Sequence, residues 1–287
     1  MKKYVLGVIA LSFAFSCKSV NQNKGNSKES LVDQFSKPEY KLPRVSVHRG
    51  GGYMPMWPEN CLESFQYVSS KMPCIIECDI EMSKDSVLVL MHDQTLDRTS
   101  TGKGKVSALE YKNLLNYSLK DNFGNITTYK IPTLNAILTW GKNNVIYTLD
   151  VKKTTPFRMV TAQIKEKNAY SYAAVITYNL KEAVEVYKLD PKVLISVSLM
   201  QVADYERLHG AGIPDKNMVA FIGTREPKKE LIDFLHTKNI KTILGVLGNL
   251  DKKAEAANNT LYTTWASLGV DIFATDRPFD VYKEIKQ

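Results

Sequence analysis

Short runs of apolar residues recur along the chain from residue 44 onward, and most are followed by a stretch with helical spacing of its apolar side chains. The apolar runs predict buried strands at residues 45–49, 75–82, 145–151, 173–177, 193–198, 218–222, 242–247 and 272–275. The amphipathic stretches predict helices at 63–70, 156–167, 180–188, 201–209, 228–237 and 254–268. Strands that alternate with helices indicate parallel βαβ units. We therefore predict an α/β fold, a (β/α)8 TIM barrel, as one domain over residues 42–287.

One part of the chain departs from this alternation. After the second predicted strand, residues 87–91 predict an extra strand, and no helical pattern follows until residues 134–140. The intervening insertion, about residues 94–131, is too long for an ordinary barrel loop. It is either a lid or small subdomain over the barrel mouth, or an excursion without a role. The glycine-rich stretch 49–52 lacks an immediately following helix, so a dinucleotide-binding fold is not favoured.

The N-terminus has the pattern of an export signal. Lys2 and Lys3 precede an apolar run, 4–15, that is too short to span a bilayer, so residues 1–16 predict a signal peptide. Cys17 follows directly, as at a bacterial lipoprotein processing site, and the polar residues 17–41 predict a flexible tether. We expect an exported lipoprotein, periplasmic or at the cell surface, anchored to a membrane through Cys17. The alternative is a plain signal peptide that contains a cysteine.

Composition and charge exclude some classes of protein. The chain is 44% apolar and 24% charged, as in ordinary globular proteins. Its net charge of +8 is spread over many lysines without long basic runs, so we expect no nucleic-acid partner. No pattern indicates an obligate protein partner. Cys74 and Cys78 lie about 13 Å apart along one predicted strand, and with Cys61 they are expected to be buried free thiols.

Charged and titratable side chains gather at the C-terminal ends of the predicted strands, where barrel active sites form. They are His48, Arg49, Glu77, Asp79, His92, Asp150 and Lys152. Residues two apart in a strand point to the same face. Glu77 therefore projects with Asp79, and Asp150 with Lys152, so that all of these groups can converge on one barrel mouth.

This set of side chains predicts a site for a hard metal ion. Glu77, Asp79 and Asp150 offer oxygen ligands of the kind that Mg²⁺ and Ca²⁺ prefer, and without a cation their charges would repel one another. Arg49 and Lys152 supply positive charge for an anionic substrate. The two histidines remain for proton transfer, one as base and one as acid. A metal, two cations and two histidines together favour cleavage of a phosphodiester.

A longer series of motifs supports this interpretation. In chain order they are His48-Arg49-Gly50, Pro58-Glu59-Asn60, Glu77-Cys78-Asp79, His92-Asp93, Leu96-Asp97-Arg98-Thr99, Gly102-Lys103-Gly104, Ile131-Pro132-Thr133-Leu134, Gly269-Val270-Asp271 and Thr275-Asp276-Arg277-Pro278. The series resembles the signature of the glycerophosphodiester phosphodiesterase family and extends over residues 44–283. The resemblance implies a barrel enzyme that uses one divalent cation, Mg²⁺ or Ca²⁺, to cleave a small glycerophosphodiester into glycerol 3-phosphate and an alcohol.

The resemblance also implies a role for each residue. The metal ligands would be Glu77, Asp79 and Asp150; the acid–base pair would be His48 and His92; and the phosphate-binding groups would be Arg49 and Lys152. Glu59 would lie at the outer edge of the metal, or would order its water or Arg49. The 2-hydroxyl of the glycerol moiety, or a water, would attack phosphorus while one histidine takes its proton and the other protonates the departing alcohol.

Three positions depart from the family pattern. Asp150 stands where the family usually has glutamate, Cys61 replaces a threonine, and the late strand at 243–249 lacks the usual tryptophan. The aromatic-rich loop 53–57 either supplies apolar contacts to a substrate or packs against the barrel. Two alternatives stay open: phospholipase D-like cleavage of lipid or lysolipid headgroups, which the tether and altered strand favour, and a non-catalytic binding protein, against which the retained histidines and carboxylates count.

Overall fold

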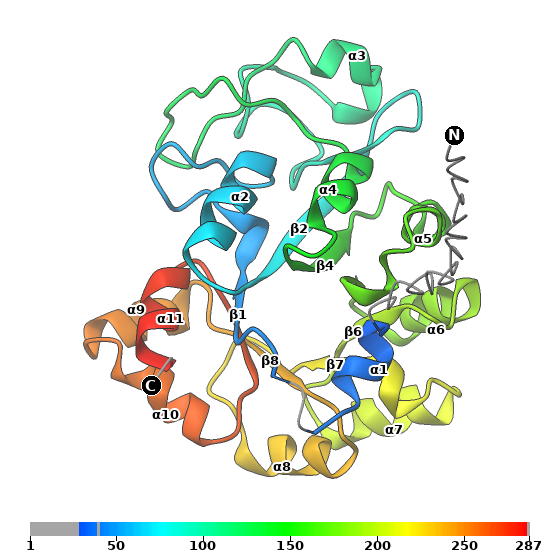
Figure 1. The fold of residues 1–287 in the computed structure, drawn as a ribbon, viewed down its shortest axis with the longest axis vertical. Coiled ribbons are helices and arrows are strands. Elements are labelled where there is room, and N and C mark those ends of the chain that lie inside the picture. Colours follow the sequence, from blue (N-terminus) through cyan, green and yellow to red (C-terminus); the bar gives the residue numbers. More distant parts are fainter. Residues whose placement is uncertain (1–28, 39–40, 286–287) are drawn as a thin grey trace, which may run out of the picture.

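The computed structural model describes residues 29–38 and 41–285, and its central feature is a closed barrel of parallel strands (Figure 1). The barrel strands are β1 (Val45–Val47), β2 (Ile75–Met82), β4 (Ile146–Val151), β5 (Ala173–Thr177), β6 (Leu194–Ser198), β7 (Met218–Phe221), β8 (Thr242–Gly245) and β9 (Ile272–Thr275). Each pairs in parallel with its neighbour, and β1 closes the ring by pairing with both β2 and β9. The predicted (β/α)8 barrel is confirmed.

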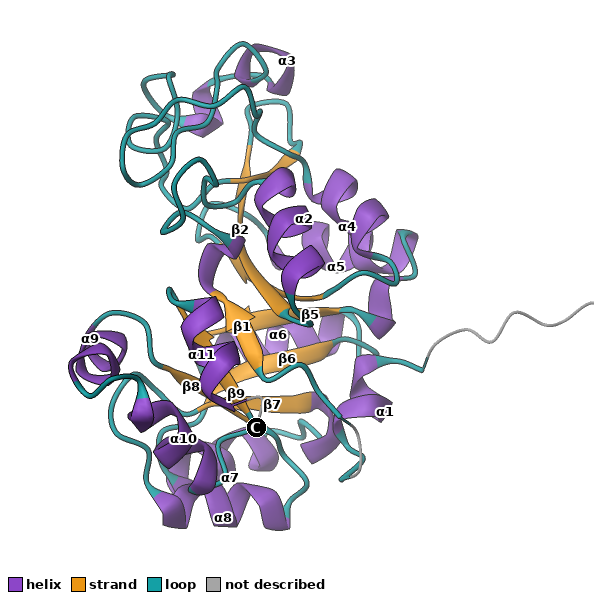
Figure 2. Cartoon of the chain, turned by 60° about the vertical axis from the view of Figure 1, so that its left-hand side comes forward, coloured by secondary structure: helices purple, strands orange, loops and turns teal. Residues whose placement is uncertain are grey.

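Helices surround the strands, as Figure 2 shows. They are α2 (Leu62–Lys71), α4 (Leu134–Gly141), α5 (Phe157–Glu166), α6 (Leu180–Leu189), α7 (Val202–Gly210), α8 (Lys229–Thr237), α9 (Asn249–Ala256), α10 (Thr260–Ser267) and α11 (Pro278–Ile285). The main apolar core, which includes Phe65, Leu149 and Trp265, joins residues of the strands to residues of these helices. Within the described ranges, no helix is both long and apolar enough to cross a bilayer.

The single helix predicted over 254–268 is wrong, because α9 and α10 are separate helices. Between them, Asn258 and Asn259 have φ angles of 51° and 64°. Asparagine is one of the few residues other than glycine that adopts this left-handed region readily, since its short side chain can hydrogen-bond locally. Two consecutive left-handed residues end α9 and redirect the chain into α10.

The prediction of a flexible tether over residues 17–41 is wrong for its C-terminal part, because the chain there forms the short helix α1 (Leu31–Phe35). Ser30 caps this helix by accepting a hydrogen bond from the Asp33 backbone N–H. Leu31 and Phe35 are buried in a cluster formed with the first residues of several barrel strands, such as Ile75 and Ile272. Because its apolar side chains close the bottom of the barrel, α1 belongs to the domain. The predicted signal peptide, Cys17 and residues 17–28 lie outside the described residues.

Phe35→Ala tests this closure of the barrel. Removal of the buried ring should lower the free energy of unfolding by about 3 kcal/mol, as for other large-to-small core changes. Ser36→Ala, one residue further and partly exposed, should change it by less than about 0.5 kcal/mol. Urea unfolding of both variants measures the difference, and equal small effects would show that α1 does not contribute to the core.

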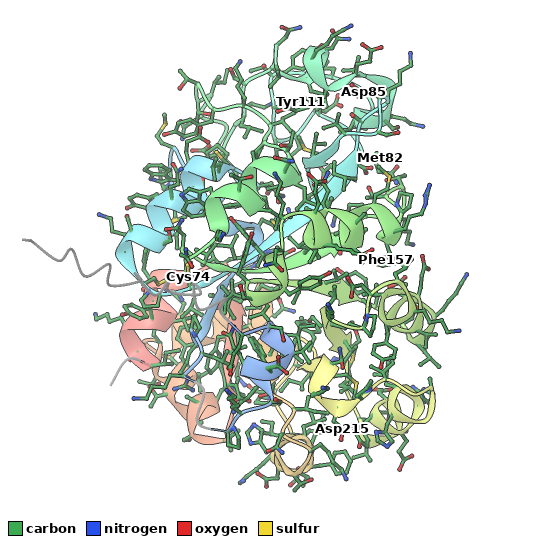
Figure 3. All side chains as sticks on the ribbon, turned by 45° about the vertical axis from the view of Figure 1, so that its right-hand side comes forward. Cys74, Met82, Asp85, Tyr111, Phe157 and Asp215 are labelled. Atoms are coloured by element: carbon green, nitrogen blue, oxygen red, sulfur yellow. The ribbon has the colours of Figure 1, made fainter. Side chains whose placement is uncertain are left out.

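The predicted extra strand after β2 is present as β3 (Leu88–Leu90), which pairs antiparallel with β2, and the insertion that follows contains the short helix α3 (Tyr111–Leu114). It has a small apolar core of its own, formed by residues that include Leu96, Val106 and Ile131. Asp85 anchors the outer end by accepting a hydrogen bond of 2.9 Å from the Tyr111 backbone N–H (Figure 3). The insertion is therefore a packed subdomain beside the barrel.

The three cysteines of the described domain are confirmed as buried free thiols: Cys61, Cys74 and Cys78. Burial raises the pKa of both Cys61 and Cys74 to about 12. Thiols that stay protonated at neutral pH are poor metal ligands and poor nucleophiles. The cysteines therefore contribute to packing, and the site chemistry rests on other groups.

Candidate active site

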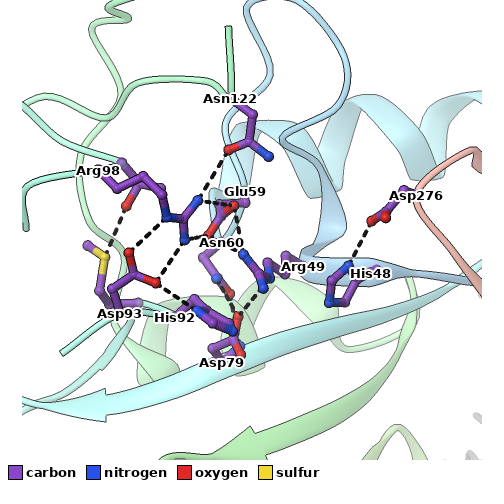
Figure 4. Close-up of polar contacts among 12 residues, drawn as sticks. His48, Arg49, Glu59, Asn60, Asp79, His92, Asp93, Arg98, Asn122 and Asp276 are labelled. Atoms are coloured by element: carbon purple, nitrogen blue, oxygen red, sulfur yellow. Dashed lines mark hydrogen bonds and ion pairs between the residues drawn. The ribbon is translucent and has the colours of Figure 1, made fainter. Parts of the chain in front are cut away.

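A cavity of about 240 Å³ opens at the C-terminal ends of the barrel strands. Six of the eight residues predicted for the site line it: His48, Glu77, Asp79, His92, Asp150 and Lys152. The other two, Arg49 and Glu59, lie beside it and join the same polar network (Figure 4). Strand ends far apart in the sequence thus place the predicted residues together.

Three carboxylates form the floor of the site. Glu77 and Asp79 are two residues apart on β2, so their side chains point to the same face of the strand. Asp150 on β4 is in register with Asp79. The three residues offer oxygen atoms that all lie within 4.8 Å of one another. Burial and the charge of Asp79 raise the pKa of Glu77 to about 8. Although Asp150 is one methylene shorter than the glutamate of the family pattern, its carboxylate reaches the other two.

The donor set fits a hard divalent cation. All three ligands are carboxylate oxygens, which suit Mg²⁺ or Ca²⁺. The Oδ1 atom of Asp150 is buried and has no hydrogen-bond partner within the described part of the chain. A buried acceptor without a partner is costly, and a cation bound among the carboxylates would satisfy it and offset their repulsion.

Lys152 lies at the edge of the carboxylate cluster. Its Nζ atom is 2.5 Å from Asp79 Oδ1 and 2.7 Å from Asp150 Oδ2. An ammonium group has three donors, so these two contacts leave one that can bind a further anion. The lysine therefore lowers the negative charge of the cluster and can also contact a phosphate held there.

The first histidine is hydrogen-bonded to a carboxylate through its Nδ1 atom. His48 follows β1, and its Nδ1 atom is 2.7 Å from Asp276 Oδ1, beyond the end of β9. Because an ionised carboxylate only accepts hydrogen bonds, Nδ1 carries the proton and Nε2 is left as the reactive nitrogen. Burial lowers the pKa of His48, but the hydrogen bond to Asp276 and the charge of Glu77 outweigh it and raise the pKa above its ordinary value.

The second histidine has the same arrangement. The Nδ1 atom of His92 is 2.7 Å from Oδ1 of Asp93, the next residue in the chain. Arg98 in turn donates to Asp93 from Nε over 2.8 Å. The hydrogen bonds from Arg98 hold the pKa of Asp93 well below its usual range. Two imidazoles with fixed orientation thus line one cavity.

The first strand was predicted to end at residue 49, but it ends at Val47 because residues 48–50 form a sharp turn. The predicted C-terminal boundary of this strand is therefore wrong. Arg49 and Gly50 have φ angles of 53° and 61° and end the strand at Val47. A Cβ atom on Gly50 would lie 2.1 Å from the ring of Phe65, so only glycine fits there. The turn directs the backbone N–H of Arg49 to Glu77, with a hydrogen bond of 2.7 Å to Oε2.

Comparisons with known proteins agree with this geometry. Residues 48–241 match the model of the glycerophosphoryl diester phosphodiesterase family. A solved glycerophosphoryl diester phosphodiesterase from Parabacteroides distasonis is 31% identical, with a TM-score of 0.81, and the match covers 90% of this chain and 93% of that one. The chain belongs to the glycerophosphoryl diester phosphodiesterase family. The resemblance seen in the sequence motifs is thereby confirmed.

Two further relatives show how far the likeness extends. Glycerophosphodiester phosphodiesterase 1 from Bos taurus is 32% identical over 126 residues, which are 42% of this chain and 36% of that protein. The chain thus matches about a third of the length of that relative. A phosphodiesterase from Oleispira antarctica, solved with the product sn-glycerol-3-phosphate, has a TM-score of 0.65 over 86% of this chain and 98% of that one. At 18% identity it shows the shared fold alone.

Two residues beside the carboxylates of this family member likewise had no role predicted from the sequence, although Asn60 was part of a motif. Asn60 donates from Nδ2 to Asp79 Oδ2 over 2.7 Å and accepts from the Asp79 backbone N–H over 2.9 Å. Such a pair of bonds fixes the orientation of a candidate metal ligand. Tyr178, which directly follows β5, lines the same cavity as Asp150, and the pKa of Tyr178 is raised by burial and by the charge of that carboxylate.

The walls of the cavity are more apolar than its floor. Ile243 and Leu247, from the late segment that departs from the family pattern, line it together with Phe221. In the loop 53–57, Trp57 stacks on Tyr67 with ring centroids 4.1 Å apart, so this part of the loop packs against the domain. Tyr53 and Met56 of the same loop are each about half exposed.

Proposed function

We propose that the protein is a metal-dependent glycerophosphodiester phosphodiesterase, which releases glycerol 3-phosphate and an alcohol. The observation that carries this proposal is one cavity lined by a cluster of three carboxylates and by both histidines, each with a carboxylate behind it. Family membership supports the diester substrate, and the product bound by the Oleispira antarctica phosphodiesterase supports glycerol 3-phosphate as the product.

The residues around the carboxylates would hold the phosphodiester. Glu77, Asp79 and Asp150 would bind one Mg²⁺ or Ca²⁺, which supplies charge neutralisation at a phosphoryl oxygen. Arg49 has a buried Nε without a hydrogen-bond partner among the described residues, 3.9 Å from Asp79. This donor and the third donor of Lys152 are suited to phosphate oxygens.

The histidines would move the protons of the reaction. Each presents Nε2, because its Nδ1 is held by Asp276 or Asp93. One accepts the proton of the attacking hydroxyl, from the glycerol 2-position or from water, and the other donates a proton to the alcohol that leaves. Attack by the 2-hydroxyl yields a cyclic phosphate first, whereas attack by water yields the linear product directly.

A substrate panel followed by ³¹P NMR tests the proposal. The purified protein, supplied with Mg²⁺ or Ca²⁺, should convert glycerophosphocholine, glycerophosphoethanolamine or glycerophosphoglycerol into glycerol 3-phosphate. A lysophosphatidylcholine sample tests the phospholipase D-like alternative, which the half-exposed side chains of Tyr53 and Met56 favour. The absence of any new phosphorus signal with every diester and both cations would contradict the proposed activity.

We also propose that the protein is exported and anchored to a membrane through an acylated Cys17. The basic residues, the short apolar run 4–15 and the cysteine directly after it support this proposal. Cys17→Ser should move the protein from the membrane fraction to the soluble fraction of the cell and abolish labelling with radioactive palmitate. Unchanged fractionation and labelling would contradict the anchor.

A further inference from the structure

Arg98 lies in the insertion, within the motif Leu96-Asp97-Arg98-Thr99, for which no role was predicted. Its guanidinium has five N–H donors, and five hydrogen bonds leave it. Two reach Asp93, from Nε over 2.8 Å and from Nη2 over 3.0 Å. Two reach Glu59, from Nη1 over 2.9 Å and from Nη2 over 2.8 Å. The fifth reaches Asn122 over 3.4 Å.

Both carboxylates also hold a residue of the candidate site. Asp93 accepts the Nδ1 hydrogen bond of His92. Glu59 accepts two bonds of 3.1 Å from Nη1 of Arg49. Arg98 therefore lies between the group that we assign to phosphate binding and one of the two that we assign to proton transfer, and Figure 4 shows the continuous chain of contacts.

The donors distinguish the two arginines. Every donor of Arg98 is taken by the protein, so none is left for a substrate. The hydrogen bonds from the side chain of Arg49 to described residues come from Nη1 alone, and its Nε is buried without a partner among those residues. Arg49 can therefore bind an anion directly, whereas Arg98 can act only through its neighbours.

The charge of Arg98 also explains how Glu59 stays ionised. Glu59 is only 2% exposed, and burial of a carboxylate raises its pKa. The hydrogen bonds and charges of Arg98 and Arg49 outweigh this effect and hold the pKa of Glu59 below its ordinary value. With four contacts from the two guanidinium groups, Glu59 has no lone pair left for a cation, so its role is to order Arg49.

We propose that Arg98 is a positioning residue that holds Arg49 and His92 as one rigid unit and ties both to the insertion. This inference rests on the proposed phosphodiesterase function. Through Arg98, the insertion then contributes to the reaction, although Arg98 itself does not contact the substrate. Loss of Arg98 would leave Asp93 free to turn away from His92 and would leave the buried Glu59 with Arg49 as its remaining cationic partner.

Arg98→Met tests the proposal through steady-state kinetics. We expect kcat to fall by about 10–100-fold, the scale seen when a residue that orients a functional group is removed, with a rise in KM from the loosened Arg49. Arg98→Lys should restore only part of kcat, because an ammonium cannot make the paired bonds to two carboxylates. Lys120→Met is the matched control, since Lys120 lies in the same insertion and donates to the Asp97 carbonyl oxygen over 3.1 Å. It should stay within about twofold of the parent protein.

A second background separates positioning from general loosening of the fold. If Arg98 acts on kcat through His92, Arg98→Met should cost less than about threefold in kcat when His92 is already alanine, because residues that act as a unit are not additive. The rise in KM should persist, since it arises at Arg49. Losses in kcat that multiply fully in the double variant would overturn the proposal.

A measurement without turnover distinguishes failure of this inference from failure of the proposed function. In ¹⁵N NMR spectra of the imidazoles, with His92 assigned from its alanine variant, Arg98→Met should reduce the fraction of His92 that carries its proton on Nδ1. The spectrum of Lys120→Met should match that of the parent protein. An unchanged His92 signal in Arg98→Met would overturn the proposal even if the protein cleaves diesters, and a changed signal would support it even if the diester panel fails.

Discussion

His48→Ala and His92→Ala should each lower kcat by about 10²–10⁴-fold, the usual contribution of a general acid or base. Each imidazole lines the cavity of the carboxylates, and each is oriented by a carboxylate at Nδ1. The binding of metal should persist, because the three candidate ligands are unchanged. Initial rates with the best diester of the panel, at saturating substrate and cation, measure the effect.

His209→Ala provides a matched control for these two variants. The Nδ1 atom of His209 is also paired with a carboxylate, Asp215, at 2.9 Å, but this histidine lies on α7 and is exposed. The variant should keep full activity. Full activity in both His48→Ala and His92→Ala would instead show that neither takes part in proton transfer.

Glu77→Gln should abolish activity yet stabilise the metal-free protein. Burial and the charge of Asp79 make an ionised Glu77 unfavourable without a cation. A neutral amide of similar shape removes this repulsion, and we expect the melting temperature in EDTA to rise by about 2–4 °C, which corresponds to about 1 kcal/mol for a domain of this size. Addition of Mg²⁺ or Ca²⁺ should raise the melting temperature of the parent protein more than that of the variant.

The pH dependence of stability should differ in the same pair of proteins. The pKa of Glu77 is raised from 4.5 to about 8 in the folded state. The folded carboxyl therefore binds its proton more tightly than the unfolded one, so its contribution is fully present at low pH and is lost as the pH rises toward 8. In EDTA, the free energy of unfolding of the parent protein, relative to that of Glu77→Gln, should fall as the pH rises from 4.5 to about 8. Parallel profiles for the two proteins would contradict the raised pKa.

The sequence predicted the floor of the site because strand geometry is regular. Alternation along β2 is enough to place Glu77 and Asp79 on one face, and the parallel arrangement of the barrel brings Asp150 and Lys152 to the same end. These placements depend on local periodicity and on one topological rule. They could therefore be derived before any distance was known.

The contacts that orient these groups could not be derived in this way. Asp276 lies 228 positions from His48, and no spacing rule predicts that the two side chains meet. The contacts of Asn60 and Arg98 likewise depend on how the turn after β1 and the insertion pack against the barrel. Motif resemblance placed all three residues within matched segments, but only geometry assigns them partners.

The helix α1 was missed for a different reason. Five residues are too few to form a stable helix by propensity alone, and the surrounding sequence is polar. The helix forms because Leu31, Val32 and Phe35 fill the open end of the barrel, which is a tertiary contact. The break between α9 and α10 was in principle visible, since the pair Asn258-Asn259 carries a recognised signal for leaving a helix.

The most direct test of the central claim is a metal titration of the protein after treatment with EDTA, with the best diester of the panel as substrate. We predict no release of glycerol 3-phosphate in EDTA and recovery of the full rate as Mg²⁺ or Ca²⁺ is added back, with no recovery in Glu77→Gln. Release at the full rate in EDTA, or full recovery in the variant, would contradict a reaction that depends on a cation bound by Glu77, Asp79 and Asp150.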